Sequence, residues 1–64
     1  MTPAKFKAAR FALGLSQAKI APLLGFSRVM SVSDIERGVV APSGSVVLLM
    51  RAFLDGYRPH NWPS

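Results

Sequence analysis

The stretch from residue 16 to residue 38 constrains the fold of this chain more than any other part of its 64 residues. Ser16 can cap a helix through its hydroxyl, apolar side chains follow it at helical spacing, and Gly25 supplies a left-handed residue where that helix should end. A second helix is predicted directly after this turn, with its end at Gly38. The stretch therefore predicts two short helices joined by a tight turn.

The second predicted helix has two different faces. Apolar residues at helical spacing place Val29, Val32 and Ile35 on one face, toward a core. The opposite face carries short polar groups, a methionine and one arginine, namely Met30, Ser33, Asp34 and Arg37. The major groove of DNA accepts a helix with an outer face of this kind. We therefore expect a DNA-recognition helix here.

Several short motifs lie along this stretch at fixed spacings. They are Leu15-Ser16-Gln17, Ala21, Gly25-Phe26-Ser27, Val32-Ser33 and Glu36-Arg37-Gly38. Through them, residues 3–54 resemble the Cro/C1-type (XRE-like) helix-turn-helix regulators. The resemblance implies an all-α fold: a compact four-helix, lambda-repressor-like domain over residues 1–56 and an irregular C-terminal tail over residues 57–64. It also implies binding of double-stranded DNA with one helix in the major groove.

The sequence departs from the family pattern in two places. Family members place the first core residue of the recognition helix six positions after the turn glycine, whereas Val32 lies seven positions after Gly25. One extra residue must therefore be absorbed between Phe26 and Ser31. Pro22 lies inside the first helix of the motif, where it removes a backbone hydrogen bond at a cost of about 3 kcal/mol in a regular interior. We expect that helix to be kinked or short.

Two further helices are predicted on either side of this pair. Thr2-Pro3 favours a helix start, and apolar residues then recur at helical spacing until Gly14. Ser43 can cap a last helix, which Asp55-Gly56 should end. The aromatic residues within these helices and turns are interpreted as core filling: Phe6, Phe11, Phe26 and Phe53. Trp62 in the tail can fold back on the core or remain free, and both arrangements stay open.

The charge of the chain is strongly positive. Eight Lys and Arg against three Asp and Glu give a formal net charge of +5, which favours a polyanionic partner, most often nucleic acid. The absence of cysteine excludes disulfides and sulfur-ligated metals, and the single histidine, His60, is a poor basis for a metal site. The apolar runs are too short to cross a bilayer. We expect a cytoplasmic protein with no cofactor, metal, membrane or small-molecule ligand.

Side chains that contact base edges are expected on the recognition helix. Arginine suits guanine, serine hydroxyls donate or accept, methionine can touch a thymine methyl, and a carboxylate can accept from cytosine. The base-edge candidates are Arg28, Ser31, Ser33, Met30 and Asp34. Two alternatives stay open. Ser27 or Ser31 can instead cap this helix, and Asp34 can instead pair with Arg37 or Arg28.

Phosphate contacts are expected from helix starts and from polar and basic side chains. The resemblance implies that Gln17, at the start of the first helix of the motif, is a phosphate clamp. The phosphate candidates are Gln17, Lys19, Ser27, Arg37 and Arg10. In the family the glutamate at Glu36 is structural, and its phase here allows it to pair with Arg10.

Three functional classes can be weighed on these observations. The first is a sequence-specific DNA-binding transcriptional regulator, in particular a small autoregulatory repressor of a phage or mobile-element operon, of the kind also encoded beside toxin or anti-CRISPR genes. The alternative is an antitoxin-like protein-interaction module whose DNA binding is secondary. An enzyme is disfavoured, because one histidine, three acidic residues and no cysteine cannot supply a nucleophile, a base and an acid.

The last predicted helix is apolar around most of its girth. Val46, Leu49, Met50 and Phe53 form one stripe, and Val47, Leu48 and Leu54 lie off it. Monomers of this size seldom keep such a patch exposed, so we expect a homodimer on a palindromic operator. The predicted dimer interface comprises Val47, Leu48, Met50 and Leu54. The alternative is that the tail, with Tyr57 and Trp62, folds over this surface.

Overall fold

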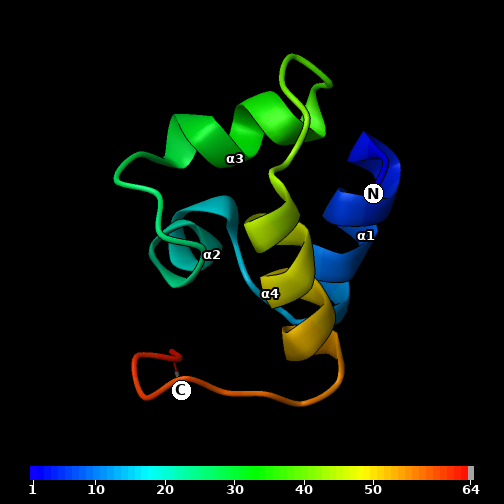
Figure 1. Ribbon diagram of the computed structural model, residues 1–64. Coiled ribbons are helices and arrows are strands. Elements are labelled where there is room, and N and C mark those ends of the chain that lie inside the picture. Colours follow the sequence, from blue (N-terminus) through cyan, green and yellow to red (C-terminus); the bar gives the residue numbers. More distant parts are fainter. Residues whose placement is uncertain (64) are drawn as a thin grey trace.

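The protein is built from four α-helices, as a computed structural model shows for residues 1–63. They are α1 (Pro3–Ala12), α2 (Gln17–Leu23), α3 (Val29–Glu36) and α4 (Gly44–Leu54). α2 and α3 pack against each other, while α1 contacts both α3 and α4 (Figure 1). Residues 1–63 contain no strand, and the predicted all-α four-helix fold is confirmed.

Three of the helices begin with the side-chain cap that the sequence predicts. The hydroxyls of Thr2, Ser16 and Ser43 are the acceptors, and each lies in an extended residue before its helix. The donors are the amides three residues on, at Lys5 (3.1 Å), Lys19 (3.1 Å) and Val46 (3.3 Å). Each cap satisfies an amide that the helix itself leaves unpaired, so these three starts are fixed by local sequence.

The start of α3 differs from the other three. Its N-cap residue is Arg28, in an extended conformation, and the Arg28 side chain makes no capping hydrogen bond. Of the two roles left open for Ser27 and Ser31, capping of this helix is therefore not observed. Ser27 and Arg28 lie in the turn between α2 and α3, and α3 begins only at Val29. The extra residue relative to the family pattern is thus absorbed in the turn, before the recognition helix begins.

Gly25 and Gly38 reverse the chain after α2 and α3, with φ angles of 85° and 77°. After each glycine the next amide returns to the helix, from Phe26 to the carbonyl of Ala21 and from Val39 to that of Asp34, both at 2.9 Å. A left-handed residue is needed to close a helix end in this way, and glycine adopts that conformation without strain. The predicted turn at Gly25 and the predicted helix end at Gly38 are confirmed.

Pro22 lies within the last turn of α2, which spans only seven residues. Its ring is exposed, and the helix ends at the following residue, Leu23. Because the missing N–H falls near the end of the helix, it removes one hydrogen bond without breaking a longer element. The prediction of a short helix is confirmed.

One hydrophobic core fills the space between the helices. Its fully buried side chains come from all four helices and are Phe6, Ile20, Val32, Met50 and Phe53. Phe26 packs at the edge of this core from the turn after α2. Phe6, Phe26 and Phe53 therefore pack in or against the core, as predicted.

Two residues that were expected in the core are exposed. Phe11 is 63% exposed because it lies five residues after Phe6, about 140° further around α1, and therefore points away from α3 and α4. Val29, the first residue of α3, is 47% exposed, whereas Val32 and Ile35 further along the helix are buried. The prediction of a core position is wrong for both.

The tail folds back onto the core. Trp62 packs edge-on against Phe53, with 5.1 Å between ring centroids, and Tyr57 stacks parallel to Phe53 at 6.2 Å. Arg58 donates hydrogen bonds to the carbonyl oxygens of Phe53 and Tyr57, and its guanidinium lies 4.1 Å from the ring centroid of Trp62. Of the two arrangements left open for Trp62, the folded-back one is observed. Ser64, at the end of the predicted tail, lies outside the described residues.

Candidate nucleic-acid interface

A hydrogen-bonded network joins α1, α2 and α3 through Glu36, the last residue of α3. Arg10 donates from Nε to Glu36 Oε2 at 2.6 Å and from Nη2 to Oε1 at 2.9 Å. Gln17 donates from Nε2 to the same Oε1 at 3.1 Å. The side chains of Arg10 and Glu36 are only 8% and 4% exposed, so this bidentate pair is buried. The predicted pairing of Glu36 with Arg10 is confirmed.

The network fixes the charge of both partners. Burial by itself raises the pKa of Glu36, but the hydrogen bonds from Arg10 and Gln17, with the positive charges of Arg10 and Lys7, outweigh burial and lower it. The hydrogen bond to Glu36 is the main cause that raises the pKa of Arg10. Both groups are therefore ionised at neutral pH, and the end of α3 is held by a full ion pair.

Arg10 is removed from the phosphate candidates by this geometry. Its Nη1 donates to the carbonyl of Leu15 at 3.0 Å, and its Nε and Nη2 are occupied by Glu36. With every guanidinium nitrogen used inside the protein and almost no exposed surface, Arg10 has no group left for DNA. The expectation of a phosphate contact from Arg10 is therefore corrected to a structural role.

Gln17 occupies the position expected of a phosphate clamp. It is the first residue of α2 and is half-buried, and its side chain is oriented by the hydrogen bond to Glu36. A glutamine amide has two N–H groups, so one remains after the bond to Glu36, beside the free amides at the start of α2. Lys19 is exposed one half-turn further along the same helix.

The base-edge candidates lie on the outer side of α3 and in the turn before it. Arg28 and Met30 are exposed, and Ser31, Ser33 and Asp34 are half-buried. Ser27, a phosphate candidate, is exposed in the turn beside Arg28. The structure thus brings the base-edge candidates together on one short helix and its entry turn. Val29 belongs with them, because its side chain is exposed instead of buried.

Asp34 and Arg37 form a second ion pair on this outer side. Arg37 Nη2 donates to Asp34 Oδ1, and it lies 4.0 Å from the sulfur of Met30. The side chains of Arg37 and Asp34 are 59% and 28% exposed, so this pair is open to solvent on the arginine side. The predicted pairing of Asp34 is confirmed, with Arg37 as its partner.

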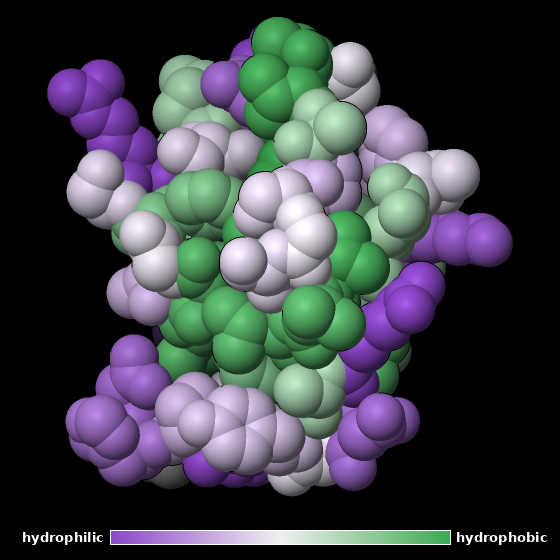
Figure 2. All heavy atoms as spheres, in the orientation of Figure 1, coloured by the Kyte–Doolittle hydropathy of each residue, from purple (hydrophilic) through white to green (hydrophobic). Residues whose placement is uncertain are grey.

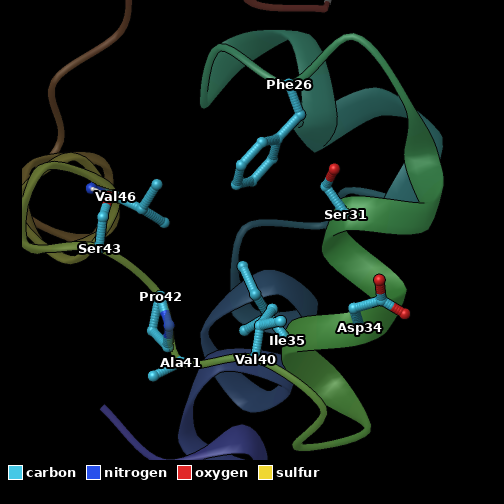
Figure 3. A pocket seen from close by; sticks show the side chains of 9 residues that line it. All are labelled: Phe26, Ser31, Asp34, Ile35, Val40, Ala41, Pro42, Ser43 and Val46. Carbon is cyan, nitrogen blue, oxygen red and sulfur yellow. Dashed lines mark hydrogen bonds between the residues drawn. The ribbon is translucent and has the colours of Figure 1, made fainter.

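A hollow of about 310 Å³ lies between α3, the start of α4 and the connection between them (Figure 3). Its walls are mostly apolar and comprise Phe26, Ser31, Asp34, Ile35, Val40, Ala41, Pro42, Ser43 and Val46. Figure 3 shows Phe26 and Val46 pointing toward each other across it. Sequence reasoning gave no sign of this hollow, because residues from four separate segments have to meet to form it.

The exposed apolar surface of α4 is narrower than the sequence suggested. Leu48 is 68% exposed, Leu54 is exposed and Val47 is half-buried, and Figure 2 shows hydrophobic residues gathered over α4. Met50 is fully buried in the core of the single chain, so it cannot line a dimer interface. The expectation for Met50 is corrected, because its position on the inner stripe with Val46 and Phe53 decides its burial.

Lys7 is a further basic side chain near the Arg10–Glu36–Gln17 network, and it is not among the phosphate candidates named from the sequence. Its charge contributes to lowering the pKa of Glu36, so it lies near the network, and its Nζ is 6.0 Å from the Phe11 ring centroid. The available sequence signal was the group of basic residues near the start of the chain, Lys5, Lys7 and Arg10.

Within residues 1–63, no group of three or more His, Cys, Asp or Glu is placed to hold a metal ion. No helix in this part of the chain has the length and apolar character needed to cross a membrane.

The fold and the site together define a helix-turn-helix DNA-binding domain: α2 and α3 are joined by the turn at Gly25, and α3 presents an exposed outer side. Residues 6–59 match the helix-turn-helix family model, and the chain belongs to this family, the Cro/C1-type (XRE) regulators. It is thus a sequence-specific DNA-binding transcriptional regulator, of a family that is typically non-enzymatic. Neither curated proteins nor solved structures gave a match.

Proposed function

We propose that this regulator is a homodimeric, cytoplasmic repressor that binds a palindromic operator and controls its own operon, in a phage or another mobile element. The observation that carries the proposal is the contrast between the inner and outer sides of α3. The end of α3 is held to α1 by the buried Arg10–Glu36 pair and to α2 by the hydrogen bond from Gln17 to Glu36, while Met30 and Arg37 on the outer side are exposed. A helix held rigidly by its inner side is suited to enter the major groove with its outer side.

The base-edge role falls to side chains on and just before α3. Arg28 is exposed at the N-cap, where a guanidinium can donate to guanine O6 and N7. Ser31 and Ser33 supply hydroxyls, and Met30 supplies an apolar contact for a thymine methyl. Asp34 stays among the base-edge candidates as an acceptor for a cytosine amino group.

The phosphate role falls to groups around this helix. They are Gln17 at the start of α2, Lys19 on the same helix, Ser27 in the turn and, newly, Lys7 on α1, while Arg37 at the end of α3 is paired with Asp34. Such contacts position the domain on the duplex and supply sequence-independent affinity. The net charge of +5 supports this distribution of roles.

The homodimer is proposed to form through Leu48, Leu54 and Val47 on α4. The folded-back tail packs on Phe53, at the inner side of α4, and leaves Leu48 and Leu54 exposed. A two-fold axis through this surface buries it on both copies. The same axis presents two recognition helices to one palindrome, and these helices lie about 34 Å apart when the half-sites are one helical turn apart. Repression follows because a bound dimer excludes other proteins from the DNA that it covers.

The test is a selection of binding sites from a pool of random duplexes of about 30 base pairs, or roughly three helical turns. We expect an enriched sequence with two-fold symmetry, bound more tightly than scrambled duplex. The affinity for both should fall steeply with salt, by about 0.9 in log affinity per log unit of salt for each phosphate neutralised. An unsymmetrical enriched sequence would contradict the dimer. A salt slope near zero would contradict DNA binding altogether.

A further inference from the structure

The outer side of α3 carries an acidic residue, which is unexpected on a surface that meets phosphates. The chain has three acidic residues in all. Glu36 is buried in its pair with Arg10, and Asp55 follows the end of α4. Among residues 1–63, Asp34 is therefore the one carboxylate on the recognition surface, and it needs a physical explanation there.

The position of Asp34 is firmly set by its backbone. Its carbonyl oxygen accepts the amides of Val39 at 2.9 Å and Val40 at 3.4 Å, which close the end of α3. Its side chain is 28% exposed and forms part of the wall of the hollow beside Ser31 (Figure 3). The backbone of Asp34 is therefore held at the end of α3 and its carboxylate lies in the wall of the hollow, while the Arg37 side chain is 59% exposed.

Arg37 is drawn back along the helix by this carboxylate. Arg37 is the C-cap residue of α3, so an extended side chain would reach past the end of the helix. Instead its Nη2 donates to Asp34 and lies 4.0 Å from the sulfur of Met30, which is seven residues earlier on the same helix. The guanidinium thus lies over the outer side of α3, the side that carries the base-edge candidates.

We propose that Asp34 is a specificity-determining residue that holds Arg37 away from the phosphates of unrelated DNA and presents a joined carboxylate and guanidinium to one base pair of the operator. The proposal rests on the DNA-reading function proposed above. Non-specific affinity depends on the number of phosphates neutralised, so a guanidinium already paired with a carboxylate contributes little to it. In a C·G pair, the cytosine amino group donates and guanine O6 and N7 accept, which matches the acceptor of Asp34 and the donors of Arg37.

The test compares four proteins on a random duplex of about 30 base pairs, or roughly three helical turns, across a salt titration. They are the wild type, Asp34→Asn, Arg37→Gln and the double variant. We expect Asp34→Asn to bind random duplex about threefold or more tightly, with a salt slope steeper by about 0.9, because one further phosphate contact forms. When residue 37 is already Gln, the same Asp34→Asn change should give little of this gain in affinity, because there is no arginine to release.

The matched control is Asp55→Asn, which removes one negative charge from an exposed residue at the end of α4. It separates release of Arg37 from a general gain of positive charge. If Asp55→Asn tightens binding as much as Asp34→Asn, or if the gain survives in the Arg37→Gln background, the proposal is overturned. Helical circular dichroism checks that each variant is folded, and Asp34→Ser replaces Asp34→Asn if the latter is not.

The same data distinguish this proposal from the function on which it rests. A wild type with no measurable salt-dependent binding to any duplex would overturn both. A wild type that binds duplex with a steep salt slope, but shows no coupling between residues 34 and 37, would overturn only the role of Asp34. On the selected operator, Asp34→Asn should gain less affinity than on random duplex, so that the ratio between the two affinities falls.

Discussion

The two ion pairs of α3 have the same chemistry and opposite environments. Arg10 and Glu36 are almost fully buried and form two hydrogen bonds to each other, and Gln17 on α2 donates a further one to Glu36, so that three helices are joined. Arg37 and Asp34 lie three residues apart on one helix, and the arginine is largely exposed. A buried pair is costly to break because one charge is left without a partner, whereas an exposed pair contributes little to stability. The first pair therefore holds the recognition helix in place, and the second is free to take part in recognition.

Deleting one partner of the buried pair should have the largest effect. Glu36→Ala leaves Arg10 buried without its counter-ion, and we expect the free energy of unfolding to fall by about 3 kcal/mol. Denaturant unfolding followed by circular dichroism measures this change. Asp34→Ala is the matched control on the exposed pair and should cost less than about 1 kcal/mol. Equal losses for the two variants would erase the distinction between the pairs.

The same contrast between buried and exposed positions exists within α4. Leu48→Glu places a charge on the exposed surface and should leave the fold intact, but it should convert a dimer into a monomer. Operator affinity should then fall about a hundredfold, because the two half-sites no longer bind as one unit. Solution mass at micromolar concentration and operator titration measure both effects.

Phe11→Glu is the control for this prediction, since Phe11 is exposed to a similar degree on α1. It should leave the mass of the dimer unchanged. An intact chain that is already monomeric, yet forms a tight complex with another protein, would favour the antitoxin-like alternative instead.

A substitution in the exposed turn before α3 should change the discrimination between DNA sequences and leave the stability of the fold unchanged. Arg28→Ala is expected to lose about 1–3 kcal/mol of discrimination between operator and random duplex, because its guanidinium is assigned to a guanine. Gln17→Ala should weaken binding to both duplexes more evenly, as a phosphate contact does. Competition titrations on the two duplexes decide this, and equal losses on every duplex for both variants would make Arg28 a phosphate contact.

The smallest expected effect is the acid sensitivity of the buried pair. The folded-state pKa of Glu36 is lowered below its value in the unfolded chain, which is about 4.3. Its stabilising contribution is therefore complete above that pH and is lost as the pH falls through the folded-state value. Thermal melts between neutral and acid pH should show this loss, and Glu36→Gln should show less of it. An unchanged acid profile in Glu36→Gln would assign the sensitivity to other groups.

Local features of the fold were predictable from the sequence. The caps at Thr2, Ser16 and Ser43 and the turn at Gly25 depend on atoms a few residues apart, so a single sequence suffices to predict them. The pairing of Arg10 with Glu36 was also predicted, because the family resemblance and helical phase agree at that position.

The errors arise where contacts between helices decide the outcome. Periodicity counted Phe11 as a core residue, but α1 is covered on one side only. Met50 was assigned to an outer surface although it shares the inner stripe of α4. The sequence showed one extra residue between Phe26 and Ser31 but did not show where it would be absorbed. The start of α3, which has no side-chain cap, was therefore not predicted. The position of Trp62 depends on a contact that no local pattern encodes.

The folded-back tail provides an intrinsic optical reporter. Trp62 is the one tryptophan in the chain, and its indole packs edge-on against Phe53 with the Arg58 guanidinium over its ring. Its emission should therefore be that of a partly shielded indole and should move to longer wavelength when the tail leaves the core. Comparing the fluorescence transition with the loss of helical circular dichroism would show, without any label, whether the tail detaches before the four helices unfold or together with them.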